Sequence, residues 1–545
     1  MLRVLLPLLS AVPLAPALSA APQVAPGHRL YGPHGTTQTY LVDVNGTIVH
    51  TWESGGLPGN GLYLEEDGVL LRSLRVNGGP SIGGVGGGAQ RIAFNGTVLW
   101  DFTYADSNHW AHHDVELLPN GNVLFIAWDL LTTADAVAAG RDPALLSGTE
   151  WYPDSIVEVQ QTGPTTGTVV WEWHMMDHVV QDFDSGLPNF GVVADHPELL
   201  DINYPPTVVG NGDWNHANSI DYDPVNDLIL LNCPFQDEFY LIDHSTTTAE
   251  AAGHTGGNFG KGGDILYRWG NPAAYDAGTV ADQQLFNPHG TSFIPEGLPG
   301  AGNLIGFNNQ AGTPFGMDFS AVYELDIPSD FSLAPGAAFG PTGFFWEYTA
   351  PNPTDLYSSG LSSAERLPNG NTLVVSGRQD GWMFELTEAK QTVWEYFNQL
   401  PNPSALVFQV SYYERTLWAS TETLALAAGA TVDFALVAGT PHAGDLYLVL
   451  GSLSGTDPGV AAGLHTLPLN VDAYFLITLT QPNTVIAGSL GTLDGLGRAT
   501  AGITLPAGSP PALAGLTAHH AFVTLDPGTG EVTHASNAVP LELNP

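Results

Sequence analysis

A short aromatic phrase recurs six times between residues 46 and 396. Each copy is a turn followed by alternating apolar residues with an aromatic side chain, the pattern of a half-buried strand. A second phrase lies between the copies and consists of an apolar strand, a polar turn and another apolar strand. Such repetition predicts a repeat architecture. The aromatic phrase occupies residues 46–52, 96–102, 167–173, 263–269, 343–348 and 391–396.

These repeats predict an all-β protein that contains a six-bladed β-propeller over residues 26–415. Six copies that each close a four-stranded unit fit radial repetition, which leaves only short, protected sheet edges. The 64 glycines and 41 prolines are spread along the chain, as expected for many short strands joined by turns. A β-sandwich or an irregular solenoid is the alternative fold that the pattern leaves open.

The last part of the chain, residues 416–545, differs in composition. The aromatic phrase is absent, Ala, Leu, Thr and Gly dominate, and short alternating strands recur. This pattern predicts a β-sandwich domain after the propeller, with an accessory role. Its adjacent histidines, His519 and His520, are expected in a loop or at the surface.

Residues 1–21 predict a signal peptide. Arg3 precedes an apolar run and a stretch of small residues at which a signal peptidase could cut. No later segment offers enough consecutive apolar residues to cross a bilayer. We therefore expect an exported protein, periplasmic or extracellular, that does not insert into a membrane.

Charge and cysteine content exclude several classes of function. Lys and Arg number 13 against 55 Asp and Glu, which gives a formal net charge of −42. This field repels phosphate backbones and anionic membranes, so nucleic acid is excluded as a partner. The single Cys233 excludes a disulfide scaffold and cysteine-based metal sites.

Three histidines occupy corresponding places before the second phrase. His113 and His289 each stand six residues before the proline of their hairpin turn, and His216 precedes an equivalent turn by a slightly longer count. Innermost strands line the channel of a propeller, so these side chains are expected to converge there. Ser362 stands at this place in the fifth hairpin. Histidine is thus not required by the repeat, which favours a functional role.

The same stretches resemble the bacterial arylsulfate sulfotransferases, also called arylsulfotransferases, from about residue 26 to 415. The resemblance implies an exported six-bladed propeller that needs no metal or nucleotide cofactor. A channel histidine would take the sulfuryl group from an aryl sulfate as sulfohistidine and pass it to a phenolic acceptor. The supporting stretches are DWNHANSIDYDPVNDLILL (213–231), HHDVELLPNGN (112–122), NPHGTSFIPEG (287–297) and the opening GHRLYGPHGTTQTYLVDVNGTIVHTW (27–52).

The resemblance also implies roles for individual residues. By motif position, His289 matches the nucleophile, His216 and Asn218 match a His-x-Asn pair, and His113 or the adjacent His112 matches a further channel histidine. A neutral imidazole is a competent nucleophile near neutral pH. Positioned donors would then stabilise the charge that develops on the sulfuryl oxygens and on the leaving phenolate.

One position departs from the family. After the strand that follows His-x-Asn, the family has an arginine, which can grip sulfate with two parallel hydrogen bonds. Pro234 stands there in this sequence. Arg378 follows the strand of the fifth hairpin in a similar way and is expected to enter the channel instead. An ion pair between Arg378 and Asp380 is the alternative.

Two other functions remain open at this point. The lost arginine and the added sandwich are consistent with a non-catalytic recognition module on the cell surface. A metal-dependent hydrolase or lyase is the second alternative, because the three channel histidines and Asp114 are all possible metal ligands.

Overall fold

The computed structural model describes residues 23–545, except 66, 207–211, 335, 399 and 401–404. Strands dominate this part and form many small sheets, which confirms the predicted all-β class. The α-helices described are short: α1 (Thr133–Ala139), α2 (Thr248–Ala251) and α3 (Ala473–Thr480). None of the described helices has the length and apolar character that a bilayer span needs. The predicted signal peptide lies outside the described residues.

Five four-stranded sheets follow the chain from an innermost to an outermost strand. They are β4 (Pro58–Leu64), β5 (Leu70–Arg75), β6 (Gly87–Ile92) and β7 (Val98–Thr103); β8 (His109–Leu117), β9 (Val123–Asp129), β12 (Asp154–Gly163) and β13 (Thr166–His174); β16 (Ser219–Asp223), β17 (Leu228–Cys233), β18 (Glu238–Asp243) and β19 (Tyr267–Trp269); β20 (Pro288–Phe293), β21 (Leu304–Asn308), β22 (Ala321–Leu325) and β23 (Trp346–Tyr348); and β24 (Ser363–Arg366), β25 (Thr372–Ser376), β26 (Trp382–Leu386) and β27 (Thr392–Phe397).

A sixth four-stranded sheet joins the two ends of this region. Its strands β1 (His28–Pro33), β2 (Gln38–Val42) and β3 (Ile48–Glu53) come first in the chain, and its innermost strand, β28 (Val407–Tyr413), comes after β27. β1 and β28 pair antiparallel, with His28 opposite Tyr413 and Tyr31 opposite Val410. Each innermost strand contacts the next around the circle, β4, β8, β16, β20, β24 and β28, and β28 contacts β4 again. The predicted β-propeller is confirmed by this closed ring.

The two sequence phrases have different places in the sheets. The aromatic phrases form the outermost strands, such as β3, in which Val49 and Trp52 are buried while Ile48 is exposed. The second phrases form the inner hairpins, such as β16–β17. Inner strands of neighbouring sheets contact one another around the axis, so side chains from several sheets meet there.

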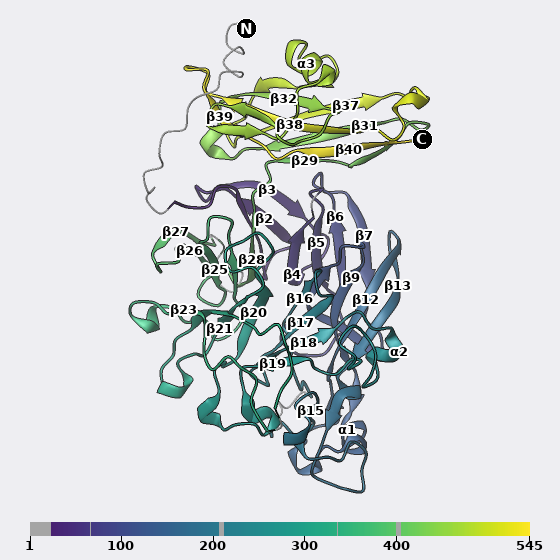
Figure 1. Ribbon diagram of the computed structural model, residues 1–545, viewed down its shortest axis with the longest axis vertical. Coiled ribbons are helices and arrows are strands. Elements are labelled where there is room, and N and C mark those ends of the chain that lie inside the picture. Colours follow the sequence, from purple (N-terminus) through teal and green to yellow (C-terminus); the bar gives the residue numbers. More distant parts are fainter. Residues whose placement is uncertain (1–22, 66, 207–211, 335, 399, 401–404) are drawn as a thin grey trace.

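The C-terminal strands form two packed sheets, as predicted, above the propeller in Figure 1. Phe434, Val449 and Phe522 lie in the apolar core. Whether residues 416–545 fold as an independent domain stays a prediction. One sheet contains β29 (Leu417–Ala419), β31 (Ala430–Val437), β37 (Arg498–Leu505) and β35 (Ile486–Ala487); the other contains β30 (Thr423–Ala425), β40 (Val539–Asn544), β38 (Thr517–Leu525), β32 (Leu446–Ser452) and β36 (Leu490–Thr492), with β39 (Val532–Ala535) beside β38.

The expected loop position of His519 and His520 was wrong, because both lie in strand β38, where His519 is half-buried. The expected surface position is also wrong for His520. His520 is fully buried, and its Nε2 lies 2.9 Å from the hydroxyl of Tyr474. A histidine whose ring nitrogen finds a partner can occupy the inward face of a strand, and the sequence contains no signal of that distant partner.

The sandwich packs on the first sheets of the propeller. The ring of Trp418 stacks on Phe94 with 5.0 Å between centroids. The backbone N–H of Thr440 donates to Asp43 Oδ2 at 2.7 Å. Apolar and polar contacts therefore hold the two parts together.

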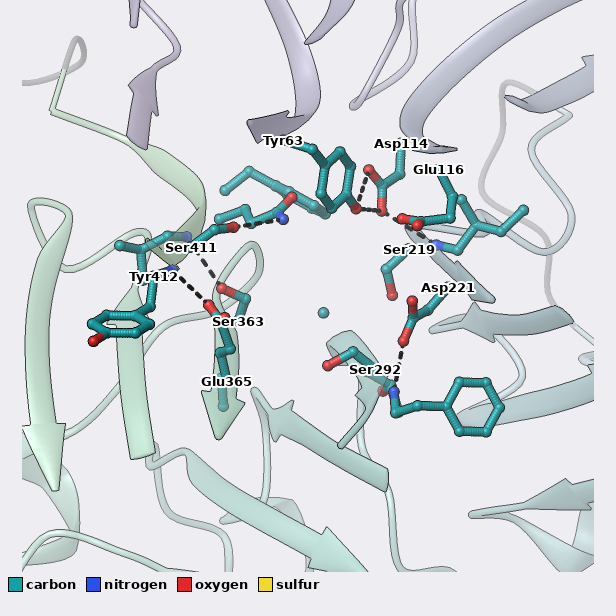
Figure 2. A pocket seen from close by; sticks show the side chains of 18 of the residues that line it. Tyr63, Asp114, Glu116, Ser219, Asp221, Ser292, Ser363, Glu365, Ser411 and Tyr412 are labelled. Atoms are coloured by element: carbon teal, nitrogen blue, oxygen red, sulfur yellow. Dashed lines mark hydrogen bonds between the residues drawn. The ribbon is translucent and has the colours of Figure 1, made fainter. Parts of the chain in front are cut away.

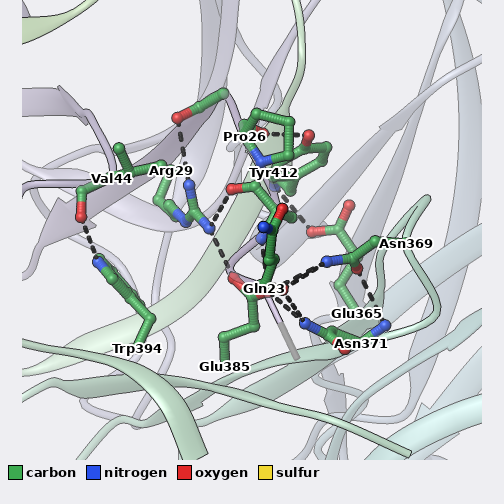
Figure 3. A network of polar contacts seen from close by, with 12 residues as sticks. Gln23, Pro26, Arg29, Val44, Glu365, Asn369, Asn371, Glu385, Trp394 and Tyr412 are labelled. Atoms are coloured by element: carbon green, nitrogen blue, oxygen red, sulfur yellow. Dashed lines mark hydrogen bonds and ion pairs between the residues drawn. The ribbon is translucent and has the colours of Figure 1, made fainter. Parts of the chain in front are cut away.

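A buried ion pair ties the closing sheet to its neighbour (Figure 3). Arg29 of β1 donates to Glu385 of β26 at 2.6 Å, and neither side chain is exposed to solvent. The other carboxylate oxygen of Glu385 accepts from the Asn371 amide at 2.6 Å and from the Ala25 backbone at 2.7 Å. The Arg29 guanidinium also lies 4.8 Å from the ring of Trp394. Both side chains are thus engaged within the protein, and of the Arg29 nitrogens Nε alone has no hydrogen-bond partner among the described residues.

Glu385→Gln should destabilise the propeller strongly. The substitution keeps the side-chain shape but leaves Arg29 buried without a counter-ion, a loss of about 3–5 kcal/mol in the free energy of unfolding. Denaturant unfolding measures the effect. Asp494→Asn is the control, since its pair with Arg498 at 3.1 Å is exposed and worth about 0–1 kcal/mol. Equal stability of the two variants would contradict the structural role of the buried pair.

Candidate active site

Three predicted site residues, His113, His216 and His289, meet in the channel. The ring centroids of His113 and His216 are 4.6 Å apart. The ring of Phe408, from β28, lies 6.2 Å from His113 and 6.3 Å from His289. His113 and His216 have φ of 48° and 56°, a left-handed conformation that is uncommon outside glycine. Such strain often marks functional positions, where the surrounding structure holds it in place.

Glycine makes room for these rings. A Cβ atom on Gly84 would lie 1.9 Å from the imidazole of His113. No other residue type fits there while the ring keeps its place. The histidine cluster therefore depends on a glycine from the neighbouring sheet that carries no reactive group.

His112 contacts His113 and holds its ring in position. Its Nδ1 lies 2.8 Å from His113 Nδ1, and its Nε2 lies 2.9 Å from Asp154 Oδ1. The ring also stacks on Trp128 with 3.9 Å between centroids. Both nitrogens of His112 are thus engaged, while His113 keeps its Nε2 for the channel. Of the two predicted alternatives, His113 is the one whose ring contacts the other channel residues.

His216 is favoured in its charged form. Its Nδ1 lies 2.5 Å from Asp213 Oδ2, and its ring stacks on Phe235 at 4.7 Å. Burial by itself would lower the pKa of His216, yet the Asp213 carboxylate outweighs burial, and the net shift of the pKa is upward. His216 can therefore serve as a proton donor at neutral pH.

His289 has the opposite electrostatic environment. Burial lowers its pKa to about 3, and the charges of His216 and Arg378 add to that effect. The backbone carbonyl of Asn287, 3.2 Å from Nδ1, accepts the proton of the neutral ring. Nε2 then carries the lone pair. At neutral pH, His289 is thus an uncharged imidazole with a nucleophilic nitrogen in the channel.

Arg378 lies beside His289. A Cβ atom on Gly360 would lie 3.3 Å from Arg378 Nε and 3.9 Å from His289 Nε2, so one small region adjoins both groups. Arg378 is exposed, and Ser358 Oγ accepts from its backbone N–H at 3.0 Å. The alternative, an ion pair between Arg378 and Asp380, stays a prediction.

Most other arginines of this acidic chain have structural partners. The guanidinium of Arg378 instead adjoins the histidine cluster, where it can bind an anion. Arg29, Arg91, Arg268, Arg366 and Arg498 pair with carboxylates, whereas Arg72 and Arg141 donate to backbone carbonyls.

Asn218 holds the backbone that carries His289. Its side-chain N–H donates to the Pro288 carbonyl at 2.9 Å, and its Oδ1 accepts from Asn232 at 2.8 Å. The amide is therefore a positioning group for the next inner strand. Its predicted part in stabilising the reacting group stays a prediction. Pro234 is buried and offers no donor, so the departure from the family motif is also a difference in local chemistry.

Sequence reasoning missed a further histidine near the cluster, His34. Burial lowers its pKa to about 4, and the charges of Arg75 and Arg378 act in the same direction. Its Nε2 is buried and has no hydrogen-bond partner among the described residues. His34 belongs to the opening stretch that resembles the family, and its Pro-His-Gly context next to a strand end was the available signal.

An acid-lined cavity of about 270 Å³ occupies the channel beyond Phe408 (Figure 2). Burial raises the pKa of Asp221 to about 6, of Asp114 to about 7 and of Glu365 to about 8, and it raises that of Glu116 as well. Asp221, Asp114 and Glu365 can therefore exchange protons near neutral pH. These acids lie on three inner strands, β8, β16 and β24, so their proximity requires three separate sheets to meet.

The whole site combines three chemical capacities. It offers a neutral nucleophilic nitrogen on His289, a charged donor on His216 and a guanidinium that can bind a tetrahedral anion. The channel thus holds, close together, side chains suited to transferring an anionic group from one molecule to another.

Comparisons with solved structures gave only distant likenesses. A protein of unknown function from Bacteroides caccae is 13% identical, with 71% of this chain and 98% of that chain covered and a TM-score of 0.41. The periplasmic gluconolactonase PpgL of Pseudomonas aeruginosa is 10% identical, with 95% and 97% covered and a TM-score of 0.34. Scores this low carry no argument for the function of this chain. The comparison with curated proteins gave no match.

A family model described as arylsulfotransferase (ASST) matches residues 30–250. This range includes His112, His113, His216 and Asn218, whereas His289 and Arg378 lie beyond it. The match supports a sulfotransferase-like function. It implies an aryl sulfate as donor and a phenol as acceptor. The resemblance predicted from the sequence motifs is confirmed, and over residues 30–250 this chain is similar to the arylsulfotransferase family.

Proposed function

We propose that the protein transfers a sulfuryl group from an aryl sulfate to a phenol through a sulfohistidine at His289. The observation that carries this proposal is that a neutral His289 and the guanidinium of Arg378 adjoin the same small region beside Gly360. A sulfate ester presents both an electrophilic sulfur and anionic oxygens. The two side chains match these two features.

In the first step, the lone pair of His289 Nε2 attacks sulfur, and the bond from sulfur to the aryl oxygen breaks. The leaving phenolate keeps the bonding electrons and takes a proton from His216. In the second step, the acceptor phenol gives its proton to His216 and attacks sulfur. The N–S bond then breaks and its electrons return to His289. Both steps balance without a redox change or a cofactor.

Arg378 would bind the sulfuryl oxygens throughout this exchange. Two parallel N–H donors fit two oxygens of a tetrahedral anion, and Asp213 keeps His216 charged across the channel. Arg378 would thereby take the role that the family's arginine has at the position of Pro234. Export of the protein, which its first residues predict, would place the reaction outside the cytoplasm.

His289→Ala should abolish the transfer while the propeller stays folded. Mass spectrometry after incubation with an aryl sulfate should detect an acid-labile adduct of about 80 daltons, one sulfuryl group, in the wild type but not in the variant. His196→Ala, which changes a half-exposed histidine outside the channel, should retain both adduct and turnover. Turnover by a folded His289→Ala protein would contradict the assignment.

Arg378→Ala should lower kcat/KM for an aryl sulfate by about 10²–10³-fold, the usual cost of one transition-state donor. Arg378→Lys should recover only part of this loss, because lysine keeps the charge but lacks the planar fork. Pro234→Arg added to Arg378→Ala should restore part of the rate. Full activity in Arg378→Ala would favour a recognition module or an enzyme of another class.

The pH profile should depend on Asp213. His289 loses its proton near pH 3, so transfer should be active above that value. His216 must carry a proton, so the rate should fall as the pH rises through its raised pKa. Asp213→Asn removes the cause of that upward shift, and the alkaline limb of kcat/KM should move to lower pH. An unchanged alkaline limb would exclude His216 as the proton donor.

A further inference from the structure

A second cluster of metal-ligating side chains lies outside the channel. It contains His178, at the end of the short 3-10 helix η3 (Met175–His178), together with His254 and Asp264 from the glycine-rich segment between α2 and β19. Each residue offers one ligand atom, and these atoms lie within 4.8 Å of one another. Within the described part of the chain, no other group of three or more His, Cys, Asp or Glu residues meets this geometry.

Both imidazoles approach the same carboxylate oxygen. His178 Nδ1 lies 2.9 Å from Asp264 Oδ1, and His254 Nδ1 lies 2.7 Å from the same atom. In tetrahedral geometry, ligand atoms at about 2.0–2.2 Å from a zinc ion are roughly 3.3–3.6 Å apart. Small side-chain movements would therefore bring these three atoms into a coordination shell.

The hydrogen bonding of His178 prepares Nδ1 as a ligand. Its Nε2 lies 2.8 Å from the backbone carbonyl of Ala251, which can only accept, so Nε2 holds the proton of the neutral ring. Nδ1 then presents a lone pair to Asp264 Oδ1. Two acceptor atoms at this separation repel each other unless a positive charge, a second proton or a metal ion, lies with them. Metal-binding histidines commonly donate their other N–H to a carbonyl in this way.

The surrounding side chains fix the cluster. The ring of Trp173 stacks on His178 with 5.4 Å between centroids and a 5° interplanar angle. Trp173 Nε1 also donates to the Gly263 carbonyl at 2.7 Å. A Cβ atom on Gly263 would lie 2.0 Å from Ala251 O and 2.7 Å from His178 Nε2. Only glycine therefore fits at position 263, where the backbone passes close to His178 just before Asp264.

Solvent reaches the cluster from one side. The side chain of His254 is 59% exposed, whereas those of His178 and Asp264 are 0% and 8% exposed. Two ligands are thus held in place by packing, and the third can close over an ion that arrives from solution. The net charge of −42 favours the approach of cations.

We propose that His178, His254 and Asp264 bind one divalent transition metal ion of the zinc type. The ligand atoms are His178 Nδ1, His254 Nδ1 and Asp264 Oδ1, and water completes the coordination on the exposed side. Imidazole nitrogen with one carboxylate selects zinc over calcium and magnesium, which prefer oxygen ligands. The ion fixes the glycine-rich segment against η3. This site is independent of the proposed sulfuryl transfer.

Zinc binding by the full-length protein tests the proposal. After treatment with a chelator, the wild type should take up a tightly bound zinc ion at this site, and zinc should raise its melting temperature by mass action. His254→Ala and Asp264→Asn should each bind one zinc ion fewer per chain and lose that thermal shift. His178 is fully buried, so His178→Ala would also disturb the packing. The test therefore uses His254→Ala, at an exposed residue, and the isosteric Asp264→Asn.

His196→Ala is the matched control. Its ring lies 3.1 Å from Glu198 and is 43% exposed, so it is a histidine–carboxylate pair without a third ligand. This variant should bind as much zinc as the wild type. Any zinc bound by the channel histidines would be present in the wild type and in all three variants. It would therefore not contribute to the differences in zinc content between them. Calcium or magnesium should produce no shift that depends on His254. Equal zinc content in the wild type, His254→Ala and Asp264→Asn would overturn the proposal and leave a cluster held by a shared proton.

Discussion

The pairing of β1 with β28 is the constraint on which the candidate site depends. The strands of this pair lie far apart in the chain, and their hydrogen bonds close six sheets into a ring. Without this pairing, β28 would have no partner strand and the innermost strands would not surround a common axis. Phe408, which contacts both His113 and His289, belongs to the closing strand. The buried pair of Arg29 and Glu385 then joins this strand's sheet to the next one.

Once the ring is closed, each histidine acquires its properties from its surroundings. His216 and His289 start from the same intrinsic pKa, yet their pKa values are shifted in opposite directions. Asp213 provides the charge that outweighs burial for His216, whereas His289 has burial, Arg378 and His216 all favouring its neutral form. Two titratable groups with separated pKa values are a common basis for acid and base roles. The division of labour in the proposed mechanism thus has an electrostatic origin.

The structure also shows what surrounds several residues that take no direct part in the proposed reaction. His112 and Asn218 matched family motifs, but their polar atoms are directed to Asp154 and to the Pro288 carbonyl. They orient neighbours, in the way that second layers of hydrogen bonds hold reactive groups. The cluster of His178, His254 and Asp264 lies away from these motifs, in two separate insertions between strands. Insertions can therefore carry chemistry that the repeat itself does not contain.

The sequence by itself determined the strands, the propeller class and the inner positions of the histidines. These properties follow from short-range patterns, since alternation sets which residues of a strand are buried and turn residues set where each strand ends. Only the tertiary structure decided which side chains meet. Arg378 and His289 are far apart in the chain and share the space beside Gly360, and His178 reaches Asp264 across a long insertion. Local patterns hold no information on such contacts, because they depend on ring closure and on packing between distant segments.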